Sequence, residues 1–218
     1  MNLKEKTMIS IDRKEIAKFF VFFISIFLVI FLVINFATFY KNIRYEVLEL
    51  LPANIEIVGD AATSDIYQKK DKPVIYNKPN SVVISKIEVE APIIIPKSSS
   101  QVDILLALKK GVAMNPDSVK PGKNGTTVIS GHSSPNLTYS GNYNTVFSLL
   151  NKLDSGDKIT IYFKKQRFIY LVENKYIFYP DEAVLPPEDK TKSTLILMSC
   201  WPVGTNWKRI AVEAKQIF

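Results

Sequence analysis

The sequence contains a single cysteine and a single histidine among its 218 residues. One cysteine excludes an internal disulfide framework and any Cys-x-x-Cys zinc or redox site. One histidine excludes the His-Glu-x-x-His motif and His-rich metal clusters. Glycine and proline are also few, with 8 and 12 residues, which excludes collagen-like and low-complexity chains. The remaining composition, 47% hydrophobic and 22% charged, is that of an ordinary folded protein.

The length and the charge limit the number of domains and the kinds of partner. A chain of 218 residues allows one globular domain with an appendage. The net charge of +7 would suit an anionic partner, but no basic motif interleaved with aromatic residues supports RNA or DNA binding. We therefore expect a solvated basic surface and no nucleic-acid partner.

The longest apolar run covers residues 19–40 and reads FFVFFISIFLVIFLVINFATFY, without a charge. As a helix rising about 1.5 Å per residue, it spans roughly 33 Å, enough to cross a bilayer core. It is apolar all round, unlike a surface helix of a soluble protein. A cleaved signal peptide has a shorter apolar core of about 7–15 residues, and residues 35–39 make a poor cleavage site. The run therefore predicts an uncleaved membrane anchor.

The basic residues that flank this run predict its orientation. Five precede it and only Lys41 and Arg44 closely follow it; the five are Lys4, Lys6, Arg13, Lys14 and Lys18. The positive-inside rule then places the N-terminus in the cytoplasm and the rest of the chain outside, as a single-pass protein of the cell membrane. The expected domains are a cytoplasmic tail (1–18), a transmembrane anchor (19–40), an extracellular spacer (41–80) and a β-rich domain (81–218).

The part that follows residue 80 is predicted to be mainly β. Strand-like runs are separated by turn residues, and two short runs, 102–108 and 145–153, have helical spacing. The segment 82–95 contains two β-rich pieces, which we expect to be separated at Ala91-Pro92. Further strands are expected at 125–130, 158–163, 168–179, 194–200 and 209–217. Seven or eight strands with two or three short helices indicate a closed barrel or a sandwich, and periodicity does not choose between them.

Three side chains at strand ends are candidates for chemistry. Cys200 ends an apolar run and precedes a Pro/Gly turn, and His132 follows the strand VIS directly. A cysteine thiolate and an imidazole are the elements of nucleophilic cysteine catalysis. Arg209 opens the last strand nine residues after Cys200, where its planar guanidinium would suit an oxyanion if the two strands are neighbours. Each residue alone has a simpler explanation: an inert buried thiol, a surface histidine and a solvated arginine.

Two segments, GTTVISGHSS and TLILMSCWPVGTNWKRIAVEA, strongly resemble the sortases, which are membrane-anchored cysteine transpeptidases of bacterial surfaces. The family pattern is a strand ending in Gly-His, a strand ending in Thr-Leu-x-x-Thr-Cys, and an arginine that begins the next strand. The resemblance extends over about residues 81–217. It implies an eight-stranded barrel of the sortase type, preceded by one transmembrane helix, and a catalytic triad of His132, Cys200 and Arg209.

The sequence departs from the family pattern in several places. Ser199 replaces the usual threonine before the cysteine, and its hydroxyl is expected to help shape the substrate-binding site. The Cys-x-Pro-x-Gly-Thr…Arg spacing is closest to pilin-polymerising class C sortases, whereas the single span and the lack of an Asp-Pro-aromatic motif favour a class D- or E-like enzyme. We expect no cofactor. Calcium use, which is known in class A sortases, is left open, because the acidic residues form no recognisable ligand spacing; these are Glu173, Asp181, Glu182, Glu188 and Asp189.

The implied partners are surface proteins that carry an LPxTG-like sorting signal. Cys200 would cleave the Thr–Gly bond of the signal to give a thioacyl enzyme, which an amine from a peptidoglycan precursor or a pilin lysine would then resolve. The competing hypothesis is a non-catalytic, membrane-tethered β-domain that binds cell-wall polymer. A serine hydrolase is disfavoured because no Gly-x-Ser-x-Gly elbow surrounds Ser130 or Ser133. An L,D-transpeptidase would want a His-Gly-Cys cluster, and Ser199 precedes the cysteine instead.

Overall fold

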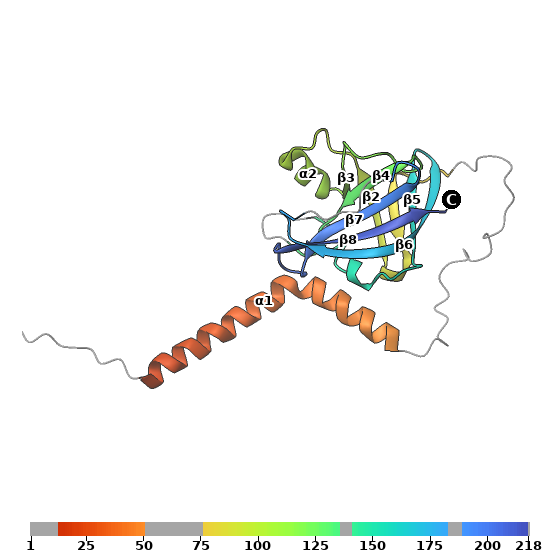
Figure 1. The fold of residues 1–218 in the computed structure, drawn as a ribbon. Coiled ribbons are helices and arrows are strands. Elements are labelled where there is room, and N and C mark those ends of the chain that lie inside the picture. Colours follow the sequence, from red (N-terminus) through yellow and green to blue (C-terminus); the bar gives the residue numbers. More distant parts are fainter. Residues whose placement is uncertain (1–12, 51–75, 136–140, 183–188, 218) are drawn as a thin grey trace, which may run out of the picture. The chain divides into compact units, whose positions relative to one another are not determined.

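The computed structural model describes residues 13–50, 76–135, 141–182 and 189–217 (Figure 1). The chain divides into two compact units, Met1–Phe36 and Ala37–Phe218. The first twelve residues and most of the predicted spacer lie outside the described residues. The division of the chain into tail, anchor, spacer and catalytic domain therefore stays a prediction.

Helix α1 runs from Arg13 to Leu50, so the helix continues beyond the apolar run into the first residues assigned to the spacer. No glycine or proline interrupts it, and Pro52 follows two residues after its end. Within the described residues, its segment Arg13–Val33 is the one helix long and apolar enough to cross a membrane. Its apolar side chains are exposed along this segment, which is compatible with a single-pass anchor.

Eight strands form a closed barrel, which confirms the predicted fold class. Around the barrel they follow the order β1-β2-β3-β4-β7-β8-β6-β5, and β5 pairs with β1 to close it. The strands are β1 (Ser81–Ile84), β2 (Val89–Ile94), β3 (Val112–Met114), β4 (Gly125–Ser130), β5 (Lys158–Phe163), β6 (Gln166–Phe178), β7 (Ser193–Trp201) and β8 (Lys208–Gln216).

Most neighbouring strands are antiparallel, but β2–β3 and β4–β7 are parallel. The parallel pair β4–β7 starts at Gly125↔Ser193 and ends at Ser130↔Met198, so both strands finish at the same end of the barrel. Strand β8 returns antiparallel to β7 and begins at that end. The topology thus brings the ends of β4 and β7 and the start of β8 together.

Three short helices complete the barrel domain: α2 (Gln101–Leu108), η1 (Ser85–Ile87) and η2 (Leu150–Lys152). Helix α2 confirms the predicted helix at 102–108 and is capped by Ser100, whose Oγ accepts a hydrogen bond from the Asp103 backbone N–H. The expected break at Ala91-Pro92 is wrong, because both residues lie inside β2. The break falls instead at η1, where Glu88 takes a left-handed φ of 52° that its residue type does not signal.

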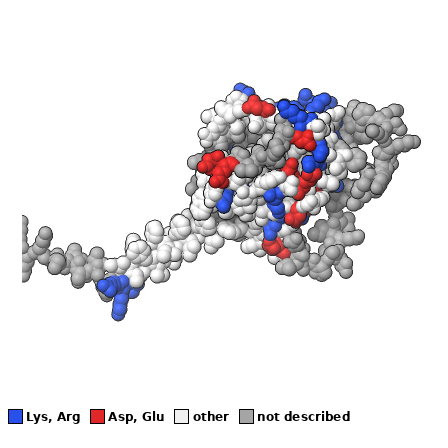
Figure 2. All heavy atoms as spheres, viewed as in Figure 1, with Lys and Arg blue, Asp and Glu red and all other residues white. Residues whose placement is uncertain are grey.

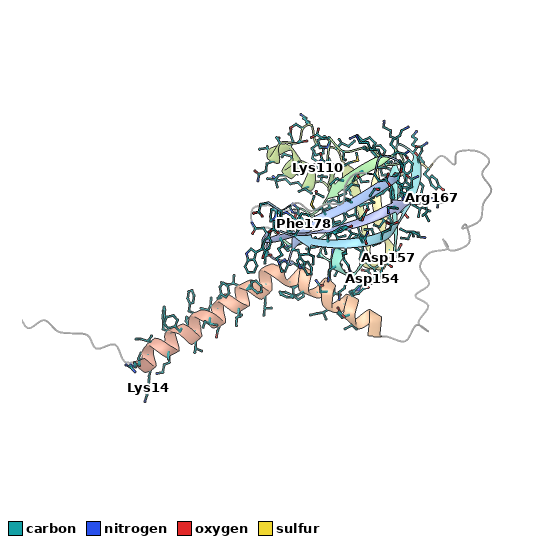
Figure 3. All side chains as sticks on the ribbon, in the orientation of Figure 1. Lys14, Lys110, Asp154, Asp157, Arg167 and Phe178 are labelled. Carbon is teal, nitrogen blue, oxygen red and sulfur yellow. The ribbon has the colours of Figure 1, made fainter. Side chains whose placement is uncertain are left out.

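The barrel interior holds the main hydrophobic core, to which every strand contributes alternate side chains. A second cluster covers the outer face of the sheet: Phe178, Ile196 and Ala211 are buried there, with Val128 and Met198 partly buried against them. Phe178 and Arg167 mark the two ends of β6 in Figure 3. Because Phe178 pairs with Arg209, its end of the barrel is the one where β7 finishes.

Acidic and basic side chains are interspersed on the face of the barrel seen in Figure 2. Several form ion pairs; Lys86 on η1 binds Asp157 at 2.8 Å and Asp154 at 2.9 Å, and both carboxylates are labelled in Figure 3. Such pairs at the surface stabilise a protein only slightly. These pairs belong to an ordinary solvated surface.

Candidate active site

Cys200 and Arg209 are direct partners across the antiparallel strands β7 and β8. Residues opposite each other in such a pair have Cα atoms about 4.5–5.5 Å apart and side chains on the same face. The nine-residue separation in sequence therefore becomes direct adjacency in space. The sequence analysis expected Arg209 to lie near Cys200 only if their two strands are neighbours, and β7 and β8 are neighbours.

His132 reaches the same place through the parallel pair β4–β7. The last paired residues are Ser130 and Met198, and beyond them the Gly131 backbone N–H donates to the Met198 carbonyl at 3.0 Å. His132 follows two residues after Ser130, at the end of the barrel that β7 reaches with Cys200. The three candidate residues thus lie at one end of three adjacent strands, in the order β4, β7, β8.

Strand alternation decides which side these residues face. On β7, Leu195 and Leu197 belong to the interior core, whereas Ile196 and Met198 belong to the outer cluster. Cys200 therefore falls on the outer face, and Arg209 shares that face with Ala211 of the outer cluster. Cys200 is a free thiol of intermediate exposure, so part of the residue is accessible to solvent.

Ser199 faces the barrel interior instead. It is only 3% exposed, and its Oγ donates to the Gly131 carbonyl at 2.7 Å. This bond joins the residue before Cys200 to the residue before His132. Ser199 thus shapes the site by holding two strand ends together, and its assignment to substrate binding stays a prediction.

Backbone carbonyl groups at the turn between β7 and β8 orient the side chain of Arg209. Nη1 of Arg209 donates to the carbonyl oxygens of Asn206 and Lys208, at 3.0 Å each. The turn itself is closed by the Thr205 backbone N–H and hydroxyl, which both donate to the Pro202 carbonyl. Gly204 has a φ of 87°, a left-handed conformation that favours glycine. Since a guanidinium has five N–H donors, the others stay available to an oxyanion.

Burial lowers the pKa of His132 from its ordinary value, because the charged imidazolium loses water contact. The imidazole is therefore mainly neutral at neutral pH. The backbone of His132 is fixed by Phe147, whose N–H donates to the His132 carbonyl at 2.9 Å. A neutral imidazole beside a thiol can accept the thiol proton and later return it to a leaving group.

Two residues of this region were not singled out by the sequence. At Gly131, a Cβ atom would come within 2.4 Å of the Phe147 ring, so no larger residue fits without displacement. Phe147 is 1% exposed and supports both Gly131 and His132. The Gly-His dipeptide after a strand was the available signal for Gly131; nothing local marked Phe147, which lies in a separate turn.

No cluster of three or more His, Cys, Asp or Glu side chains suited to a metal ion occurs among the described residues. The candidate site is made of a thiol, an imidazole and a guanidinium. The absence of a cofactor stays a prediction.

The sortase domain model matches residues 82–217, which is more than half of the chain and includes all four candidate residues. The chain belongs to the sortase family. Sortase D of Bacillus subtilis (strain 168) is 30% identical to it over 138 residues, which cover 62% of this chain and 61% of that relative. This chain thus spans about three fifths of the length of the relative that it matches.

Solved sortases share the barrel. A sortase D5 transpeptidase of Clostridium perfringens gives a TM-score of 0.52 at 25% identity, over 64% of this chain and 79% of that one. Sortase C from Clostridium perfringens SM101 gives 0.50 at 26% identity, over 63% and 68%. Sortases are cysteine transpeptidases, so the family supports this reaction class in general.

Proposed function

We propose that this sortase cleaves an LPxTG-like sorting signal and joins the surface protein to an amine of the cell wall or of a pilin. Cys200 is the nucleophile, His132 the proton carrier and Arg209 the oxyanion donor. The observation that carries the proposal is the register: the three residues lie at one end of neighbouring strands, with Cys200 directly opposite Arg209.

The reaction proceeds in two acyl transfers. The Cys200 thiolate attacks the carbonyl carbon of the Thr–Gly bond, and the oxygen becomes an oxyanion that accepts hydrogen bonds from Arg209. When the carbon–nitrogen bond breaks, imidazolium His132 protonates the departing glycine amine, leaving a thioester. An incoming amine then attacks this thioester, gives its proton to His132 and releases the thiolate.

The outer face supports an apolar substrate segment. Val128 on β4 and Met198 on β7 are half-buried on the face that carries Cys200, and they pack on the outer cluster. The leucine and proline of a sorting signal would gain free energy by covering such side chains. A peptide laid along β4 and β7 would thus bring its scissile bond to the strand ends.

The proposal also includes the location of the reaction. Helix α1 anchors the enzyme in the cell membrane with its N-terminus in the cytoplasm, and the barrel works outside the cell on sorting signals. The apolar run of residues 19–40 and the five basic residues before it support this topology.

The test of the reaction uses the full chain in uncharged detergent, LPxTG peptides and an amine acceptor. Cys200→Ala is expected to abolish both the thioester, detected by mass spectrometry, and the transpeptidation product. Cys200→Ser is also expected to be nearly inactive, because a hydroxyl has a much higher pKa than a thiol. Turnover by a folded Cys200→Ala protein would end the cysteine mechanism, and wild-type protein that forms no thioester with any peptide would favour a binding domain.

A further inference from the structure

The last turns of α1 belong to the same compact unit as the barrel. The boundary between the two units falls inside this helix, so residues Ala37–Leu50 are grouped with the strands. Tyr45 packs against the main hydrophobic core, and the ammonium group of Lys152 on η2 lies 5.4 Å from the centre of its ring. Arg44 forms an ion pair with Glu88 at 2.9 Å. The end of the helix is therefore docked on the barrel.

Lys41, the first charged residue after the apolar run, contacts a turn that supports the candidate active site. Its Nζ donates to the carbonyl oxygen of Thr145 at 3.3 Å. The same oxygen accepts hydrogen bonds from Ser148, from the backbone N–H at 3.2 Å and from Oγ at 2.9 Å. Thr145 and Ser148 are both buried, at 9% and 2% exposed. The helix thus supplies a charged donor to the carbonyl group that closes the turn 145–148.

The turn 145–148 carries Phe147, which holds the residues at the end of β4. Its backbone N–H donates to the His132 carbonyl at 2.9 Å, and its ring would lie 2.4 Å from a Cβ atom at Gly131. Such close packing leaves little room for one part to move without the next. A continuous series of contacts therefore runs from Lys41 through the turn to His132.

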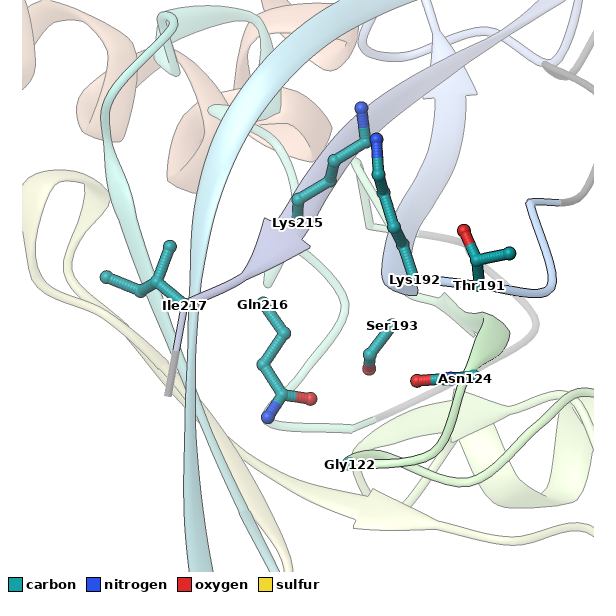
Figure 4. Close-up of a pocket in the computed structure, with 8 residues that line it drawn as sticks. All are labelled: Gly122, Asn124, Thr191, Lys192, Ser193, Lys215, Gln216 and Ile217. Carbon is teal, nitrogen blue, oxygen red and sulfur yellow. The ribbon is translucent and has the colours of Figure 1, made fainter. Parts of the chain in front are cut away.

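The other end of the barrel has no comparable arrangement among the described residues. An open hollow lies there, at the beginning of β7 (Figure 4). Its wall includes Lys215 and Gln216, which are neighbours on β8 and therefore face opposite sides of the sheet. In Figure 4 the ammonium groups of Lys192 and Lys215 point away from Gln216. The polar groups of the hollow thus do not converge, whereas three donors meet on one carbonyl at the turn 145–148.

We propose that the end of α1 positions His132 for proton transfer, with Lys41 as the positioning residue. Lys41 does not touch the reacting atoms. It holds the carbonyl of Thr145, the turn holds Phe147, and Phe147 holds the backbone of His132. The inference rests on the proposed transpeptidation and deepens it, because it makes the helix that would anchor the protein a part of the catalytic domain.

Steady-state kinetics of the full chain in uncharged detergent, with LPxTG peptides and an amine acceptor, test this role. Lys41→Met removes the ammonium group but keeps an unbranched stem. It should lower kcat roughly three- to tenfold and leave KM unchanged, because the substrate still binds while the imidazole is less well placed. Lys41→Arg keeps a charged donor and should restore most of kcat.

The matched control is Arg44→Met, which removes the same charge three residues further along the helix. Arg44 pairs with Glu88 on the surface, and such pairs contribute little stability. This variant should keep the kcat of the wild type. An equal loss in Arg44→Met would overturn the role of Lys41 in favour of helix docking in general, and circular dichroism checks that each variant is folded.

Amide hydrogen exchange gives a second measurement that needs no turnover. The Phe147 amide, which donates to His132, should exchange about three- to tenfold faster in Lys41→Met, while the amides of β8 keep their rates. Equal acceleration throughout the barrel would mean general destabilisation and would refute the positioning role. Unchanged kcat and unchanged exchange at Phe147 would refute it too, and would leave the proposed reaction intact. If the wild type forms no thioester, the proposed reaction fails, whereas faster exchange at Phe147 alone would still establish the link from Lys41 to His132.

Discussion

Arg209 is oriented by the chain itself, since one of its nitrogens donates to two backbone carbonyls of the preceding turn. A lysine at this position would keep the charge but lose the planar fork that makes these contacts while facing an oxyanion. We expect Arg209→Lys to lower kcat/KM substantially and Arg209→Ala to lower it by about 10²–10³. Peptide-cleavage kinetics on folded protein measure kcat/KM for each variant. Near-normal rates in Arg209→Ala would show that Arg209 is a solvated charge on the strand without a role in the reaction.

His132 offers a direct titration experiment, because it is the only histidine in the chain. Burial lowers its pKa in the folded protein below the ordinary value of 6.5. The unfolded chain therefore takes up this proton first, so the group contributes stability above about pH 6.5 that is lost as the pH falls through the lower, folded pKa. NMR of the imidazole signals should give a midpoint below 6.5 in Cys200→Ala, where no thiol couples to the titration. A midpoint above 6.5 in that variant would contradict the desolvation.

For individual residues, the sequence identified the candidates for the site, but it did not predict the direction of every side chain. Cys200, His132 and Arg209 were found because each stands at a strand end in a known order, and their catalytic roles stay predictions. The inward direction of Ser199 depends on the register of β7 within the barrel, which local sequence does not encode. Phe147 was missed for the same reason, because its contact with Gly131 is made by the fold.

At the scale of the strands, the Ser199–Gly131 hydrogen bond helps to hold the end of β4 against β7. Ser199→Ala leaves the Gly131 carbonyl without this partner, at a cost of about 1–3 kcal/mol in the free energy of unfolding. We also expect a lower kcat with little change in KM, since the strand ends that carry Cys200 and His132 become less firmly held. Ser199→Thr keeps the hydroxyl and serves as the matched variant.

Denaturant unfolding and steady-state kinetics measure both effects. Restoration of kcat by threonine but not by alanine supports positioning by the hydroxyl. If Ser199→Ala raises KM alone, the residue contributes to substrate binding instead.

The elements themselves were largely predictable, with informative exceptions. The long alternating runs became β5, β6 and β8, and the continuous apolar run became β7. Strand β3 was missed because three residues are too few to show a period. The strands after residue 157 were expected to cover 158–163 and 168–179, yet β6 begins at Gln166, so only Lys164 and Lys165 form the turn, both at positive φ. Lysine does not signal this conformation as Asn-Gly would.

For the whole molecule, the helix α1 leads to a prediction about location. If its apolar segment is an uncleaved anchor, the mature protein keeps its N-terminus and sediments with membranes. Protease added outside intact cells should digest the barrel and spare the N-terminal tail, as probed with tags at both ends. A soluble product starting near residue 40 would instead identify the run as a signal peptide.

The parallel pairing of β4 with β7 also has a kinetic consequence. Ser199 and Gly131 are 68 positions apart, so strand β7, which carries Cys200, and strand β4, which His132 follows, meet only after a long stretch of chain has been ordered. Closing such a loop costs entropy before any contact is gained, and non-local pairings of this kind slow folding. A nascent or refolding chain can therefore form its local hairpins before β4 and β7 pair and bring His132 and Cys200 to the same end of the barrel. If the proposed function is right, transpeptidase activity should appear late, together with closure of the barrel, because Cys200, His132 and Arg209 are not brought to one place until the chain around them is complete.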